Sequence, residues 1–409
     1  MKRKEVFISF ILACGLAALP LNVSAQKRLS AEEARQEERV QVEKWMGEVS
    51  GVYGAMWRSK VFTLDSLRMP IMYKVFGEKP ADGRSLYISM HGGGSTPTAV
   101  NDQQWRNQIV LYAPKDGVYV APRAPFDDWN MWFRPQMDDF FQQLIAAAVV
   151  EMDVNPDKVY LLGYSAGGDG VWRMAPRMAD RWAAASMMAG HPGEASQLNL
   201  RNVPFMIWMG ENDGAYNRNR LAAEKGAVMD SLHAADPAGY VHETHIVAGK
   251  GHWMDRADTL AIAWMAKYRR NVVPERVVWR QEETVRPSMY WLKVDASKAR
   301  PGMEIVASRK GNRIVVERCD YPSFTLCLND DVADLDKPVI VEYNGRRLLK
   351  KRVRRSADTI ARSLRERQDP RLVFSAELEV RMPDRQAAYG DILRPFMHRR
   401  YVTYGLSLL

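Results

Sequence analysis

The 409-residue sequence has few of the residues that hold small or metal-dependent proteins together, with three cysteines and seven histidines. A chain of this length with 46% hydrophobic residues can bury a sizeable core, so it needs no disulfide network or structural metal to fold. It contains no internal repeat at solenoid periods. These absences exclude a disulfide scaffold and a repeat protein, and they leave a globular chain of two or three domains.

A long membrane-spanning run is also lacking. Residues 2–4 are basic, residues 6–21 are apolar, and the small-x-small pattern of signal peptidase cleavage ends at Ala25. This order predicts a signal peptide over residues 1–25 and export to the periplasm or beyond. An alternative is a lipoprotein anchored through Cys14, which ends a loose lipobox. The apolar stretch is shorter than the ~20 residues that span a bilayer, so we expect no stable membrane insertion.

Removal of the signal peptide leaves two cysteines, Cys319 and Cys327. In an oxidising compartment they could form a disulfide that closes a hairpin, or they could remain small buried thiols. The sequence leaves both alternatives open.

Removal of the signal also lowers the net charge from +9 to +7, and much of the excess lies in residues 346–355. This basic run could hold an anionic polymer, such as a polysaccharide, or lipid headgroups. It is more typical of a strand edge that charge protects from unwanted pairing. Since no nucleic-acid motif accompanies it, we expect no nucleic-acid partner.

The most informative stretch begins with a turn signal at residues 155–157 and an apolar run at residues 159–162. Gly163-Tyr164-Ser165-Ala166-Gly167 follows, and helical spacing continues beyond it. Strand, sharp turn and helix form the context of a G-x-S-x-G nucleophile elbow, in which glycines permit the tight turn that exposes the serine. A glycine-rich turn without chemistry is the alternative for Ser165.

Strands and helices alternate around this stretch. We expect strands at residues 70–75, 85–90, 117–121, 159–162, 182–189, 203–209 and 241–247, and helices at residues 137–152, 166–179, 219–232 and 259–268. This order predicts an α/β fold, with a mostly parallel sheet covered by helices on both faces. Ligands bind at the carboxyl ends of the strands in such sheets.

The domain organisation follows from changes in this pattern. Residues 26–60 form an N-terminal amphipathic helical segment that begins with a capping box at Ser30. Residues 61–272 form the α/β catalytic domain. Residues 273–382 carry short alternating runs and one helix, which predict a small mainly-β domain. Residues 383–409 form a C-terminal extension without clear periodicity.

A serine nucleophile needs a base, and the base needs an acid to orient it. Asp213 lies four residues past an apolar strand, and His252 follows the next strand. The chain order Ser165, Asp213, His252 is the order expected of this elbow type. Glu211 is an alternative acid, but it lies closer to the strand end and has less loop with which to reach the base.

The oxyanion of a tetrahedral intermediate needs two hydrogen-bond donors. The run from residue 91 to residue 94, His-Gly-Gly-Gly, follows an earlier strand and lets backbone N–H groups approach a ligand. The candidate donors are the N–H groups of Ala166 and Gly93. His242 and His245 invite a zinc hypothesis with His252, but their spacing places the first two on opposite faces of a strand, so we expect neither a metal nor another cofactor.

Several residues are candidates for contact with the substrate. Trp129 and Trp132 follow the strand beside the His-Gly-Gly-Gly loop, His191 follows another strand, and Tyr164 precedes the nucleophile. Core packing is the alternative for the two tryptophans, and a histidine at a proline turn is the alternative for His191.

At these motifs the chain resembles the secreted α/β-hydrolase superfamily of serine hydrolases. It is similar to the bacterial branch near polyhydroxybutyrate depolymerase-like and feruloyl esterase-like enzymes, and to predicted peptidases of prolyl oligopeptidase type. The resemblance covers residues 69–268 and lies in residues 91–94, 155–157 and 163–168, Asp213, and residues 251–253. Residues 101–105 and 167–170 resemble a bacterial subgroup that carries an attached β domain.

The resemblance and the residues together predict an exported serine hydrolase that cleaves a small-molecule or polymer-linked carboxylic ester through an acyl-enzyme on Ser165. No long insertion between Gly170 and Asp213 supplies a deep lid, so we expect short or aromatic esters to be preferred over long-chain triglycerides and peptides. The alternatives are a serine peptidase of prolyl oligopeptidase type, and an inert binding protein whose β domain contacts polysaccharide.

Overall fold

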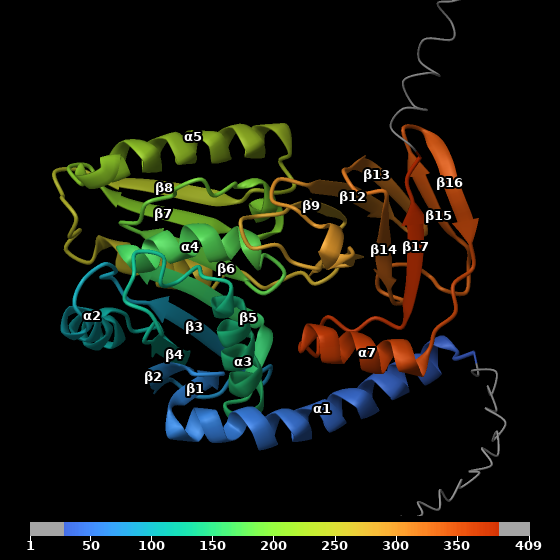
Figure 1. Ribbon diagram of the computed structural model, residues 1–409, viewed down its shortest axis with the longest axis horizontal. Coiled ribbons are helices and arrows are strands. Elements are labelled where there is room, and N and C mark those ends of the chain that lie inside the picture. Colours follow the sequence, from blue (N-terminus) through green and yellow to red (C-terminus); the bar gives the residue numbers. More distant parts are fainter. Residues whose placement is uncertain (1–27, 384–409) are drawn as a thin grey trace, which may run out of the picture.

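A computed structural model describes residues 28–383 of the chain. The predicted signal peptide, Cys14 and residues 384–409 of the predicted C-terminal extension lie outside the described residues. Figure 1 shows an α/β half that carries one large sheet and a second half that is rich in strands. Helix α1 (Ala31–Ser59) runs along both halves.

Within residues 28–383 the large sheet has eight strands in the order β1-β2-β4-β3-β5-β6-β7-β8. The strands are β1 (Val61–Leu64), β2 (Leu67–Phe76), β3 (Arg84–Met90), β4 (Gly117–Pro122), β5 (Val154–Tyr164), β6 (Ala184–Met188), β7 (Phe205–Gly210) and β8 (His242–Val247). Strands β1 and β2 pair antiparallel, β2 also pairs antiparallel with β4, and every later pairing is parallel. This strand order is that of the α/β-hydrolase fold, which confirms the predicted fold class.

Helices cover both faces of this sheet. They are α2 (Thr98–Leu111), α3 (Gln136–Glu151), α4 (Ala166–Arg177), α5 (Arg218–Ala235) and the short α6 (Leu260–Met265). Apolar residues of α3, α4 and α5 belong to one buried cluster, and those of α2 and α6 belong to a second cluster on the other face. Neighbouring residues of β3 show the alternation, since Leu86 and Ile88 join the first cluster while Tyr87 joins the second.

Helix α1 joins the two halves of the molecule. The predicted capping box is present, because Ser30 Oγ accepts from the Glu33 N–H at 3.2 Å and Glu33 Oε2 accepts from the Ser30 N–H at 2.8 Å. Trp45 and Val49 of α1 lie in a buried cluster with residues of α3 and of α7 (Ala357–Arg367). The helix therefore packs on both halves, as Figure 1 shows.

The C-terminal half confirms the mainly-β prediction of the fold class. One sheet has the order β16-β15-β13-β12-β9 and a second has the order β10-β11-β14-β17. The strands are β9 (Arg276–Arg280), β10 (Ser288–Met289), β11 (Leu292–Lys293), β12 (Glu304–Lys310), β13 (Arg313–Cys319), β14 (Ser323–Leu328), β15 (Val339–Tyr343), β16 (Arg346–Lys351) and β17 (Ala376–Arg381). Cys319 and Cys327 are buried in different sheets and are not bonded to each other, so the disulfide alternative does not occur in this structure.

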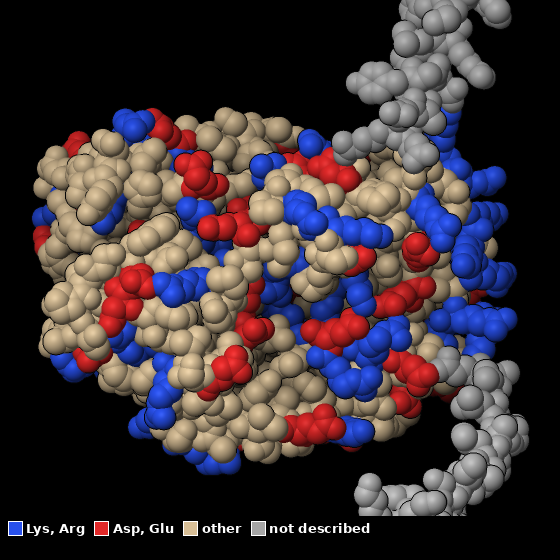
Figure 2. All heavy atoms as spheres, viewed as in Figure 1, with Lys and Arg blue, Asp and Glu red and all other residues tan. Residues whose placement is uncertain are grey.

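Strand β16 explains the basic run. It is the edge of its sheet, its two leucines are half-buried, and its arginines and lysines are exposed. Figure 2 shows these cations along the right edge of the molecule. The interpretation as a charged strand edge is confirmed for residues 346–351, where charge opposes pairing with another chain, whereas Arg355 of the same run is buried and pairs with Asp330.

A buried ion cluster ties the two halves together. Asp369, from the loop after α7, accepts from Arg270 at 2.5 Å and from Arg181 at 2.9 Å. Burial alone would raise the pKa of Asp369, but the two arginines lower it to about 2. The carboxylate is therefore ionised and paired at neutral pH, which holds the strand-rich half against the α/β half.

Candidate active site

Ser165 occupies the sharp turn between β5 and α4. Its backbone has φ +57° and ψ −122°, a strained conformation that non-glycine residues seldom adopt. Its N–H donates to the Met188 carbonyl at 2.9 Å, which fixes the turn against β6. A Cβ atom added at Gly163 would lie 2.3 Å from the Gly167 carbonyl oxygen, so the turn needs glycine there. This is the local geometry of a nucleophile elbow.

Three side chains meet at the carboxyl ends of β5, β7 and β8. His252 Nε2 lies 2.9 Å from Ser165 Oγ, and His252 Nδ1 lies 2.7 Å from Asp213 Oδ2. Asp213 is buried, with 3% of its surface exposed. Glu211 instead accepts from the Gly249 N–H at 2.7 Å, so among the described carboxylates Asp213 is the one bonded to His252.

The glycine loop after β3 lies against the elbow. A Cβ added at Gly92 would be 3.1 Å from Ser165 Cβ, and one added at Gly94 would be 3.5 Å from Ala166 Cβ. The Gly94 N–H is already used, since it donates to Asn101 Oδ1 at 2.8 Å. The Gly93 N–H donates to no acceptor within residues 28–383. Ala166 is the first residue of α4, and N–H groups in the first turn of a helix lack an intrahelical acceptor.

His91 and Trp132 hold this loop in place. The His91 ring is fully buried, its Nδ1 lies 2.6 Å from the Gly92 carbonyl oxygen, and its Nε2 accepts from the Ala124 N–H at 3.2 Å. Burial lowers the pKa of His91 to about 3, so the ring is neutral. The Trp132 indole N–H donates to the His91 carbonyl at 2.9 Å.

Trp132 and Tyr164 differ from their predicted role as substrate contacts. Trp132 is fully buried and stacks on Phe141 in the core, so the core-packing alternative describes it. Tyr164 points behind the elbow, where its hydroxyl donates to the His252 carbonyl at 2.5 Å. A residue next to the nucleophile occupies the strand end, and alternation turns its side chain away from the cavity.

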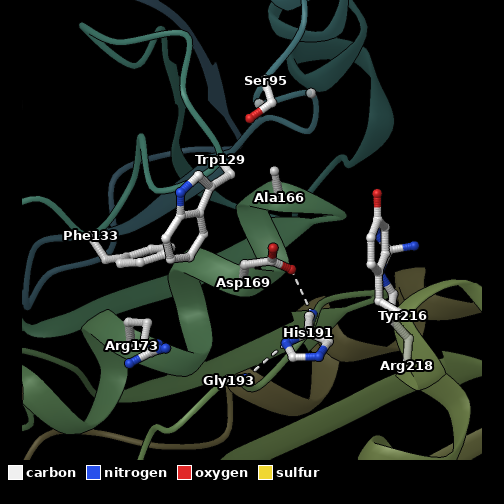
Figure 3. A pocket seen from close by; sticks show the side chains of 12 residues that line it. Ser95, Trp129, Phe133, Ala166, Asp169, Arg173, His191, Gly193, Tyr216 and Arg218 are labelled. Carbon is white, nitrogen blue, oxygen red and sulfur yellow. Dashed lines mark hydrogen bonds between the residues drawn. The ribbon is translucent and has the colours of Figure 1, made fainter.

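A cavity of about 390 Å³ opens beside the elbow (Figure 3). Its lining residues are Gly93, Gly94, Ser95, Trp129, Phe133, Ala166, Asp169, Arg173, His191, Gly193, Tyr216 and Arg218. Trp129, which is 60% exposed, and Phe133 meet edge to face at 5.3 Å and form one wall, and Tyr216 stands opposite (Figure 3). Trp129 and His191 therefore line the cavity next to the elbow, and their contact with a substrate stays a prediction.

Polar groups form the floor of this cavity. The His191 N–H donates to Asp169 Oδ1 at 2.6 Å, and His191 Nδ1 accepts from the Gly193 N–H at 3.0 Å. Burial lowers the pKa of His191, and Arg218 and Arg173 lower it further. Burial raises the pKa of Asp169 to about 6, although the His191 N–H acts in the opposite direction.

Arg173, Tyr216 and Arg218 also line the cavity and were not predicted from the sequence. A signal for the first was present, since Arg173 lies seven residues after Ala166 and four after Asp169, on one face of the helix that begins at the nucleophile. Tyr216 and Arg218 lie in the turn and helix start just after Asp213, where periodicity carries no information about orientation.

The histidines of the zinc hypothesis have other partners. His242 Nε2 lies 3.0 Å from Asp230, and His245 Nε2 lies 2.9 Å from Glu243. Across the described residues, no three histidine, cysteine or acidic side chains are grouped to hold a metal ion. In the same part of the chain, no helix combines the length and the apolar character that crossing a bilayer requires.

The α/β-hydrolase fold thus carries serine, histidine and aspartate side chains that are hydrogen bonded in series, which is the arrangement that serine hydrolases use. The sequence matches no family model and no curated protein. Among solved structures it is similar to a thermostable esterase, at 18% identity and a TM-score of 0.39, over 51% of this chain and 62% of that chain. It thus spans less than two thirds of that first match.

Two further solved structures match this chain at similarly low sequence identity. A ferulic acid esterase is 14% identical with a TM-score of 0.35, over 51% of this chain and 95% of that one. An acetyl xylan esterase from Aspergillus awamori is 11% identical with a TM-score of 0.34, over 48% of this chain and 93% of that one. At this level of similarity the fold assignment rests on the strand order and the elbow of the chain itself.

Proposed function

We propose that the protein hydrolyses carboxylic esters through an acyl-enzyme on Ser165. The observation that carries this proposal is the series of hydrogen bonds from Ser165 Oγ to His252 at 2.9 Å and from His252 to Asp213 at 2.7 Å. A base in hydrogen-bond reach of a serine, and an acid that orients that base, are the requirements for activating a hydroxyl group at neutral pH.

In the first half of the reaction, Ser165 Oγ attacks the ester carbonyl carbon while His252 Nε2 takes the hydroxyl proton. The carbonyl π electrons move onto oxygen, and the N–H groups of Gly93 and Ala166 stabilise that oxyanion. Each donor at such a site is worth about 3 kcal/mol of transition-state stabilisation. Asp213, buried beside the ring, stabilises the imidazolium that forms.

Collapse of this intermediate breaks the bond from carbonyl carbon to alcohol oxygen. His252 gives its proton to the departing alkoxide, which leaves as the alcohol, and the acyl group stays on Ser165. Water then attacks the acyl carbon with His252 as the base. A second collapse releases the carboxylic acid and returns the proton to Ser165.

An ester with a short acyl group fits this site better than an ester with a long acyl chain. The cavity is small, about 390 Å³, and Trp129, Phe133 and Tyr216 give it flat aromatic walls. Aromatic rings favour flat or short apolar groups, with a contact worth about 1 kcal/mol. A serine peptidase is the second candidate, because the same triad can protonate an amine leaving group.

We further propose that the protein is exported and that its chain is divided into a catalytic domain and an appended domain. Residues 1–25 would direct export, with acylation at Cys14 as the alternative, and mass spectrometry of the mature N-terminus distinguishes a start at Gln26 from a lipidated Cys14. Residues 61–272 would form the catalytic domain and residues 273–382 an appended domain. The exposed cations of β16 support contact of that domain with an acidic polysaccharide to which ester substrates are linked.

The test is a kinetic panel of short acyl, aromatic acyl, long-chain triglyceride and peptide substrates. We expect kcat/KM to be highest for short or aromatic esters and to vanish in Ser165→Ala, whose Tm should stay near that of the natural protein. Peptide cleavage above every ester in kcat/KM would replace the esterase proposal with the peptidase.

A further inference from the structure

Two arginines line the cavity beside Ser165, and neither takes part in the proton transfers between Ser165 and His252. Arg173 projects from α4, and Arg218 begins α5. Figure 3 shows them on either side of His191, below the aromatic walls. Their side chains are only 16% and 13% exposed, so both guanidinium groups have lost most of their water.

Neither guanidinium is fully paired. Arg173 makes no hydrogen bond within residues 28–383, and its ion pair with exposed Glu283 is 3.7 Å long. Arg218 reaches Asp213 Oδ1 at 3.5 Å, but the other oxygen of that carboxylate is bonded to His252. The Arg218 Nε is buried and has no acceptor within the described residues. Buried cations are normally matched by an anion, so spare N–H groups in a cavity indicate a place for one.

Aromatic rings and a glycine fix the two groups. The Arg173 guanidinium lies 5.3 Å from the Phe133 ring centre, and Arg218 lies 5.0 Å from that of Tyr216. A Cβ at Gly193 would lie 2.3 Å from Arg173 Nη2, so the absence of a side chain at this position of the loop after β6 leaves room for the guanidinium. Two oriented, planar donors on opposite sides of a cavity suit a carboxylate.

The remaining charges in the cavity do not cancel these cations. His191 is neutral there, and Asp169 accepts the His191 N–H with one oxygen, which leaves it a single negative charge at most. The side chains that line the cavity therefore include two arginines and one carboxyl group, while the long ion-pair partners Asp213 and Glu283 lie outside the lining. A neutral ester would offer the spare N–H groups of these two guanidinium groups no charged acceptor.

We propose that the cavity formed around Arg173 and Arg218 selects esters that carry a carboxylate, placed in the part of the substrate that enters between Trp129 and Tyr216. This inference rests on the proposed ester hydrolysis and names its substrate class. The bound carboxylate accepts from both arginines, while the scissile ester lies at Ser165. The substrates are therefore half-esters of flat dicarboxylic acids, or esters of alcohols that bear an acid group.

Matched pairs of substrates test this selectivity. Methyl 4-carboxybenzoate against methyl 4-carbamoylbenzoate places the charge on the acyl side, and 4-carboxyphenyl acetate against 4-carbamoylphenyl acetate places it on the alcohol side. The kcat/KM ratio of each pair, divided by the ratio of alkaline hydrolysis rates, removes intrinsic reactivity. We expect the charged substrate of at least one pair to be preferred about tenfold or more, the size of charge-assisted hydrogen bonds.

Variants assign the preference to the arginines. Arg173→Gln and Arg218→Gln should each lower the normalised ratio at least fivefold, whatever they do to turnover of both substrates. Arg220→Gln is the matched control, because Arg220 is exposed, pairs with Glu224 and lies outside the cavity. It removes the same charge two residues from Arg218 and should leave the ratio unchanged.

An equilibrium measurement separates this inference from ester hydrolysis itself. Ser165→Ala should bind 4-carbamoylbenzoate at least tenfold more tightly than neutral terephthalamide, and adding Arg173→Gln should remove the difference. Charged and neutral ligands that bind alike, normalised ratios of one or below in both pairs, or a preference that survives both arginine changes would overturn the inference. Selective binding without turnover of any ester would overturn the proposed function instead.

Discussion

The hydroxyl group of Tyr164 donates a 2.5 Å hydrogen bond to the backbone carbonyl of His252. The residue that precedes Ser165 in the chain thus holds the loop that carries His252. The Tyr164 ring also packs edge to face against the His252 ring at 5.8 Å. The 2.9 Å contact between Ser165 and His252 therefore depends on a bond that forms behind the elbow.

Tyr164→Phe should lower kcat about fivefold with little change in KM, because loss of a hydrogen bond of about 1 kcal/mol loosens the base but leaves the cavity intact. Steady-state kinetics on a short ester measures this. Tyr160→Phe is the control, since Tyr160 on the same strand donates to the Tyr268 carbonyl away from the site. Equal effects of the two changes on kcat would show that Tyr164 has no positioning role.

Asp213→Asn should lower kcat by about 10³ to 10⁴, because the imidazole loses its countercharge and its correct tautomer. Glu211→Gln should have little effect, since glutamine retains an oxygen that can accept from the Gly249 N–H. A larger loss of kcat in Glu211→Gln than in Asp213→Asn would exchange the two assignments.

Trp129→Ala should lower kcat/KM for aromatic esters about fivefold, the loss of roughly 1 kcal/mol of aromatic contact, with Tm nearly unchanged because this side chain is mostly exposed. Trp132→Phe should instead lower Tm, because it leaves the buried His91 carbonyl without its hydrogen-bond donor. A drop in Tm for Trp129→Ala without a change in kinetics would contradict this placement of the cavity wall.

The loss of folding stability at acid pH should depend on His91. Its pKa is about 3 in the folded protein because burial disfavours the charged ring, against about 6.5 when unfolded. Between these pH values only the unfolded chain takes up the proton, so stability is lost as pH falls below about 6.5, by about 2 kcal/mol at pH 5.

His91→Gln should remove that part of the pH dependence, although its stability at pH 8 should also be lower. Unfolding free energies of both proteins from pH 8 to pH 5 provide the measurement. Parallel curves over this range would show that burial of His91 does not contribute to the loss.

The sequence alone located the elbow and the order Ser165, Asp213, His252, because the first two residues follow strongly apolar strands and His252 follows the next strand in the chain. Helix α2 was not predicted, since its buried side chains include the polar Asn101 and Gln108 and give no apolar period. Asn101 satisfies the Gly94 N–H, Thr96 and Asp127 at once, a set of contacts that only the folded chain brings together.

In the tryptophan-rich segment, the sequence pattern does not predict which side chains are buried. Trp129 and Trp132 are three residues apart with similar neighbours, yet one is exposed on the cavity wall and the other is buried under the glycine loop. The backbone turn at residues 128–133 separates the two side chains, and sequence periodicity does not predict such a turn. The edge position of the basic strand β16 was easier to predict from the sequence, because exposed charge on a short strand is itself typical of a sheet edge.

The most direct test of the central claim is labelling with a fluorophosphonate, followed by peptide mapping with tandem mass spectrometry. We predict one adduct, on Ser165, which disappears in Ser165→Ala while Tm stays near that of the natural protein. A folded protein that takes up no label, or an adduct that persists in Ser165→Ala, would contradict it.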